Sequence, residues 1–213
     1  MVSFMCYCIN MRRVLGFIFL LFFAPGFVSQ AFADGIEVRK TEAYFADGNY
    51  HLAADFNINL NFVVDQALTR GIPLYFVSEF TLTRPRWYWL DEVVVQNEQV
   101  NKLSYNLLTR QYRITRGTLF QNFDSLADAL RIVGHQSVPP IGAELLKGGG
   151  NYITAKLLKK EDGFVAAVRL RLDVTQLPKP LQVNALTGND WNLDSNWYSW
   201  IVRPDTVVRN KPE

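Results

Sequence analysis

Beyond residue 34 the chain is dominated by alternation of apolar and polar residues, the pattern of strands with one buried face. In Leu52–Leu60 every second residue is apolar, and from Ala54 onward each of these apolar residues is separated from the next by an Asp or an Asn. Phe164–Val174 repeats the pattern against arginines and an aspartate. Between the first two strands, Asp47-Gly48-Asn49 predicts a hairpin turn, because glycine accepts the positive φ that such turns require.

The same reading predicts the other elements. One helix is expected over Phe62–Thr69, with Asn61 as its N-cap. A second is expected to begin after Asp124-Ser125 and to end at Gly134. Leu177–Pro180 is expected to be extended, because prolines interrupt pairing. The alternation changes face around Thr109-Arg110, which a bulge or a tight turn would both explain. Further strands are expected at 36–39, 74–83, 87–95, 103–107, 112–114, 152–160 and 197–202, and a crossing loop with one helical turn at 138–150.

Eight or nine strands, two short helices and no βαβ rhythm indicate a mainly β fold. We expect a single antiparallel β-sandwich domain over residues 34–213, immunoglobulin-like in broad architecture. The analogy is architectural only, because the cysteine pair of antibody domains is absent. The 180 residues of this segment are enough for one apolar core.

The first 33 residues have the pattern of an export signal. Arg12 and Arg13 precede an unbroken apolar run, Val14–Phe23, and a small-x-small cleavage pattern follows at Ala31 and Ala33. Cleavage would leave Asp34 as the first residue of a periplasmic protein. The alternative is an inner-membrane anchor through an uncleaved signal, although a spanning helix needs about 20 apolar residues. No second apolar run is long enough to predict a membrane span after cleavage.

The charge and cysteine content indicate which partners and which covalent crosslinks the exported domain is not expected to have. Arg12 and Arg13 belong to the signal, so the remaining 20 basic residues balance 20 acidic ones. A neutral domain without a basic tract is not expected to bind nucleic acid. Both cysteines, Cys6 and Cys8, also precede Asp34, so the exported domain would contain no disulfide.

No catalytic, cofactor-binding or metal-binding motif stands out. We therefore predict that the protein is not an enzyme and that it binds neither a cofactor nor a metal ion. His51 and His135 are the only histidines, and both are expected to be structural. A calcium-loop pattern of oxygen ligands at alternate positions lacks the glycine and glutamate that such a loop needs. Its four residues, expected to form a polar turn or outer face, are Asp190, Asn192, Asp194 and Asn196.

Aromatic side chains are the remaining clue to function. They form two groups, Trp87, Tyr88 and Trp89, and then Trp191, Trp197, Tyr198 and Trp200. Neighbours on a strand point to opposite faces, so neither group can lie wholly on one face. Some of these rings therefore cover a second apolar layer or form an exposed binding surface for a partner or glycan.

Three stretches carry a resemblance to a known family: Leu103–Arg113, Leu177–Gln182 and Trp191–Trp200. They resemble an uncharacterised family of exported proteobacterial domains, a domain of unknown function sometimes labelled a proline-rich signal peptide protein. The resemblance implies a small periplasmic domain, often encoded beside a membrane sensor kinase of the nitrogen-response type. It supplies no catalytic residues.

Two function hypotheses follow. The first is a non-enzymatic periplasmic interaction module that binds a membrane or envelope protein, such as the sensor kinase that the family's gene order suggests. The second is a periplasmic domain that binds a small ligand or glycan through exposed aromatic side chains.

Overall fold

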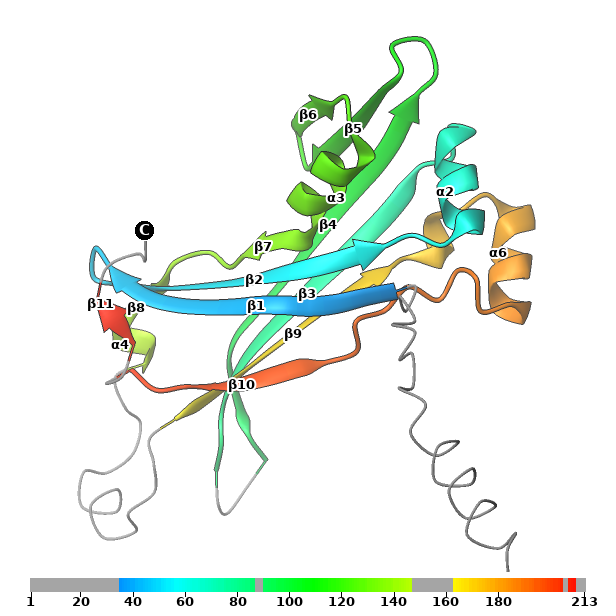
Figure 1. Cartoon of the computed structure of the whole chain (residues 1–213). Coiled ribbons are helices and arrows are strands. Elements are labelled where there is room, and N and C mark those ends of the chain that lie inside the picture. The colour runs from blue at the N-terminus through cyan, green and yellow to red at the C-terminus, as the bar shows by residue number, and fades with distance from the viewer. Residues whose placement is uncertain (1–34, 87–89, 147–162, 205–206, 210–213) are drawn as a thin grey trace, which may run out of the picture. The chain divides into compact units, whose positions relative to one another are not determined.

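The computed structural model describes residues 35–86, 90–146, 163–204 and 207–209, all within one compact unit, Asp34–Glu213. The predicted signal segment with Ala31, Ala33 and Asp34, the strand predicted at 152–160, and Trp87–Trp89 lie outside the described residues. Among the described residues, most of the regular structure is β, in two sheets around a common core (Figure 1).

The first sheet is built on a long hairpin and has the spatial order β11-β1-β2-β7, with β8 also paired to β2. All pairings are antiparallel except that of the two-residue β11, which runs parallel to β1. The predicted turn joins β1 to β2, with positive φ at Asp47 and Gly48. The strands are β1 Gly35–Ala46, β2 Asn49–Asn59, β7 His135–Ser137, β8 Ile141–Gly142 and β11 Val208–Arg209.

The second sheet has six strands in the order β10-β9-β3-β4-β5-β6, and every pairing is antiparallel. Its strands are β3 Leu74–Arg84, β4 Glu92–Asn106, β5 Gln111–Arg116, β6 Leu119–Phe123, β9 Phe164–Leu172 and β10 Tyr198–Val202. The prediction of a mainly β fold with antiparallel sheets is confirmed, whereas immunoglobulin-like architecture is not.

The core lies between the inner faces of the sheets and follows the predicted alternation. In β9 every second residue is buried, from Phe164 to Leu172, and β2 shows the same period from Leu52 to Ile58. The inward residues of β3 complete this layer, because β9 and β4 flank that strand. They are Leu74, Phe76, Ser78, Phe80 and Leu82.

Short helices pack against this core and bury Val64, Ala129 and Leu146 in it. They are α2 Phe62–Thr69, α3 Leu126–Gly134, α4 Ala143–Leu146 and α6 Lys179–Thr187, with a 3-10 turn, η1, at Val174–Gln176. The predicted bounds of α2 and the end of α3 are confirmed, and α4 is the predicted single helical turn. At Gly134 the helix α3 meets β2 so closely that a Cβ would lie 2.3 Å from the carbonyl oxygen of Phe56.

Two local expectations are corrected or decided. The extended conformation predicted for Leu177–Pro180 is wrong for its second half, because α6 begins at Lys179 with Pro178 as its N-cap. Proline is tolerated in the first turn of a helix, where backbone N–H groups have no partner inside the helix. The change of face around residue 109 is a tight turn, with Arg110 at φ 56°, joining β4 to β5.

Candidate functional site

The strand β10 lies at an edge of the second sheet. Within the described part of the chain it pairs only with β9, from Tyr198 opposite Val168 to Val202 opposite Phe164. The outer side of an edge strand presents backbone N–H and C=O groups that are free to pair with another chain. We call Trp197–Val202 the aromatic edge.

The aromatic edge exposes large apolar side chains on both of its faces. Tyr198, Trp200 and Val202 share the face turned toward the core, and Val202 is buried there. The Trp200 ring is half-buried, 6.5 Å from the Phe80 ring and 6.1 Å from the Tyr198 ring between centroids.

The side chains at the start of the strand, and those on the face turned away from the core, are more exposed than Trp200. Tyr198 is 45% exposed, Trp197 before it is 48% exposed, and Ile201 on the opposite face is 60% exposed. A partner strand placed beside β10 would therefore meet apolar side chains above and below the sheet.

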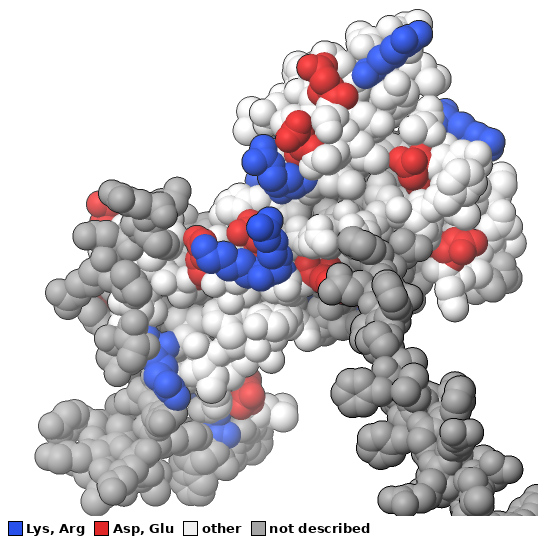
Figure 2. All heavy atoms as spheres, in the orientation of Figure 1, with Lys and Arg blue, Asp and Glu red and all other residues white. Residues whose placement is uncertain are grey.

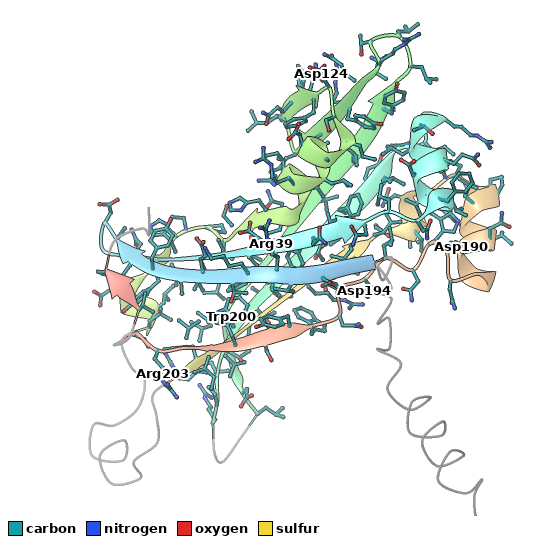
Figure 3. The ribbon with its side chains drawn as sticks, viewed as in Figure 1. Arg39, Asp124, Asp190, Asp194, Trp200 and Arg203 are labelled. Carbon is teal, nitrogen blue, oxygen red and sulfur yellow. The ribbon has the colours of Figure 1, made fainter. Side chains whose placement is uncertain are left out.

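The segment before the aromatic edge is fastened to β9 by the main chain. The N–H of Leu172 donates to the carbonyl of Leu193 at 2.8 Å, and the N–H of Ser195 donates to the carbonyl of Leu170 at 2.9 Å. The Ser195 hydroxyl also accepts the N–H of Leu170. This pairing determines where β10 begins, and Figure 3 shows Asp194 close to that point.

Four charges on the outer face of the second sheet reinforce this attachment. The Arg169 guanidinium donates to both carboxylate oxygens of Asp194, with Nε 2.9 Å from Oδ1 and 3.1 Å from Oδ2. Arg171 donates to Glu79 at 3.1 Å, and Arg169 lies 4.0 Å from the same glutamate. The hydrogen bond from Arg169 lowers the pKa of Asp194, and so does the N–H of Asn196, whereas burial opposes both.

The calcium-loop pattern is not assembled into a site. The carboxylate of Asp194 is occupied by Arg169, while Asp190 lies beside α6 with its side chain in solvent (Figure 3). Neither histidine gathers ligands: His51 stacks on Tyr44, and the Nδ1 of His135 lies 2.6 Å from a carboxylate of Asp55. Among the described residues no group of three or more His, Cys, Asp or Glu could hold a metal ion.

The structure divides the second predicted aromatic group. Trp191 is only 4% exposed and belongs to the core, so of the two alternatives for these rings it takes the apolar layer and not the exposed binding surface. Trp197, Tyr198 and Trp200 stay together on the edge strand. Trp200 also lines a cleft between the sheets of about 10 Å³, which is room for one water molecule and too small for a sugar.

A second surface was missed by sequence reasoning. The turn between β4 and β5, Leu107–Arg110, and the end of α2 border an open concavity of about 460 Å³. It is lined by Arg70, Leu107, Leu108 and Arg113, among others. Two adjacent leucines in a turn, where Asn, Asp, Gly and Pro are favoured, were the signal that could have revealed it.

Among the residues described on one face of the molecule, charges of both signs are interspersed. On the face shown in Figure 2, basic and acidic side chains alternate with uncharged ones. In addition, none of the helices in the described ranges is long and apolar enough to cross a membrane.

Comparison with known proteins identifies a family but no activity. One family profile covers residues 33–201, which include both sheets apart from β11 and the aromatic edge as far as Ile201. No curated protein and no solved structure matches the chain. The chain belongs to the family described as a domain of unknown function, DUF4390.

Proposed function

We propose that this domain is a non-enzymatic interaction module that binds an extended segment of a partner protein along the aromatic edge. The observation that carries the proposal is a strand edge with which no other described strand pairs, combined with exposed Tyr198 and Ile201 on its two faces. Added strands gain affinity from main-chain hydrogen bonds and specificity from alternate side chains. The edge offers both.

The N-terminal segment and the family resemblance support an envelope location for this interaction. An export signal cleaved after Ala33 would place the domain in the periplasm. The partner would then be a membrane or envelope protein, such as the sensor kinase suggested by gene order in the family. The intact mass of periplasmic protein tests the location, with a start at Asp34 expected and a full-length chain in the membrane fraction contradicting it.

The aromatic edge is tested by placing a charge on it. Lysine on an edge strand discourages strand addition because a buried ammonium must be desolvated. Ile201→Lys changes a side chain that is 60% exposed, and Val183→Lys on α6 is a matched control at 62% exposure. Neither change removes a core residue.

The assay is crosslinking in living cells followed by capture of the full chain. We expect the wild type and Val183→Lys to enrich the same membrane or envelope protein, and Ile201→Lys to lose it. If no envelope protein is enriched, or if Ile201→Lys retains it, the proposal fails. A saturable change in tryptophan fluorescence with cell-wall fragments, unaffected by Ile201→Lys, would favour the alternative of glycan binding.

A further inference from the structure

We infer that the turn between β4 and β5 docks on an anionic membrane surface, with its leucines entering the lipid and three arginines contacting phosphate groups. We call Leu107–Arg110 the leucine turn. The inference is independent of the aromatic edge, because it rests on different residues at another strand end. Figure 1 shows this hairpin projecting past the neighbouring strands of its sheet.

The leucine turn presents apolar side chains that are mostly in contact with solvent. Leu108 is 95% exposed and Leu107 is 62% exposed. The turn is held in shape by the Asn106 side chain, whose Oδ1 accepts the N–H groups of Leu108 at 3.0 Å and Thr109 at 3.3 Å. A preorganised turn with two solvent-facing leucines loses little conformational entropy when it enters an apolar phase.

Three exposed arginines surround these leucines. Arg110 ends the turn, Arg113 follows on β5, and Arg70 follows α2. Arg70 and Arg113 line one concavity with both leucines, so charge and apolar surface are contiguous. Among the described residues none of the three arginines has an ion-pair partner, which leaves their charge available to an outside anion.

Arg113 contacts uncharged side chains. The Nε of Arg113 donates to Asn122 at 2.9 Å, and its guanidinium carbon lies 5.0 Å from the Phe120 ring centroid. Asp124 accepts a hydrogen bond from Gln111 at 2.9 Å and is labelled to the left of the hairpin tip in Figure 3. Asp65 is in the first turn of α2, the opposite end from Arg70.

The chemistry of this patch matches a lipid surface. Arginine pairs with phosphate through two parallel hydrogen bonds, and leucine gains free energy on leaving water. Combined apolar and electrostatic attraction is how peripheral proteins bind anionic bilayers reversibly. A free phosphate would use the arginines but would leave both leucines in water, so a bilayer fits the patch better.

The test uses a local probe in the full chain, so that binding through the apolar run at residues 14–23 is distinguished from docking by the turn. Leu108→Trp places a fluorophore on the turn, and Leu119→Trp, at a leucine 75% exposed on β6, is the matched control. Vesicles contain brominated phosphatidylcholine with or without phosphatidylglycerol. Quenching beyond the wild-type signal reports contact between the new ring and the acyl chains.

We expect quenching of Leu108→Trp on phosphatidylglycerol vesicles, with little for Leu119→Trp. Replacing Arg70, Arg110 and Arg113 by Gln in the Leu108→Trp chain should weaken vesicle affinity by about a hundredfold, since each basic residue near such a surface contributes severalfold. Equal quenching at both positions, no quenching of Leu108→Trp, or equal binding to neutral vesicles would overturn the inference. No partner protein is present, so the result is separate from the test of the aromatic edge.

Discussion

Replacing Asp194 by Asn tests what positions the aromatic edge. This carboxylate joins the segment before β10 to Arg169 on β9 and also accepts the N–H of Asn196 at 2.8 Å. Its side chain is only 19% exposed. Asparagine preserves the size of the side chain but removes its charge, so the guanidinium loses its main anion and keeps only Glu79 at 4.0 Å.

The expected cost follows from the geometry. A hydrogen bond to a charged group contributes about 1.5–3 kcal/mol, and an asparagine oxygen can keep part of it. Arg169 is 29% exposed and retains some contact with water, so we expect about 2 kcal/mol less stability at pH 7. The aromatic edge begins only a few residues later. We therefore also expect the emission of Trp197 and Trp200 to move to longer wavelength, because their rings become more mobile and more exposed to water.

The effect should depend on pH in a defined direction. The folded-state pKa of Asp194 is lowered, chiefly by the hydrogen bond from Arg169. Its contribution is therefore complete well above the unfolded pKa of about 3.9 and is lost as the pH falls through the folded-state pKa. The stability difference between the wild type and Asp194→Asn should be constant near neutrality and shrink in acid.

Urea denaturation followed by tryptophan fluorescence measures this difference. Asp190→Asn is the matched control, because it is the same substitution at an exposed side chain in the same segment. It should change the free energy of unfolding by less than about 0.5 kcal/mol. Equal effects of the two substitutions, or a difference that grows as the pH falls, would refute the role assigned to Asp194.

Three further predictions concern the scaffold. Gly134→Ala should cost about 1–3 kcal/mol, because its Cβ would lie 2.3 Å from a main-chain oxygen of β2. Gly142→Ala, whose Cβ would have no atom within 4 Å beyond its chain neighbours, should be near neutral in the same urea titration. Asn61→Ala removes the oxygen that accepts an N–H of α2 at 2.9 Å and should lower stability by about 1 kcal/mol, measured by the urea midpoint. Trp191→Ala should cost about 3–5 kcal/mol and Trp197→Ala about 0.5, by thermal unfolding; similar losses would contradict their different burial.

Features controlled by neighbouring residues could be predicted from the sequence. The turn at Asp47-Gly48 and the cap of Asn61 on α2 depend on backbone conformation and on hydrogen bonds that span a few residues. The alternation in β2 and β9 likewise predicted which side of each strand is buried. Where local rules conflict, as at Pro178 and Pro180, the sequence pattern was ambiguous, because proline suits both an extended chain and the first turn of a helix.

The candidate sites depended on contacts between distant residues. Trp191 and Trp197 are equally apolar, yet one is in the core and the other on an edge, since exposure depends on which strands and helices cover a position. That β10 ends its sheet follows only from the order of six strands. The leucine turn likewise meets Arg70 only because β4 and α2 end side by side. Contacts within a few residues therefore set the local elements and their buried faces, whereas the packing of distant segments sets which apolar side chains stay exposed.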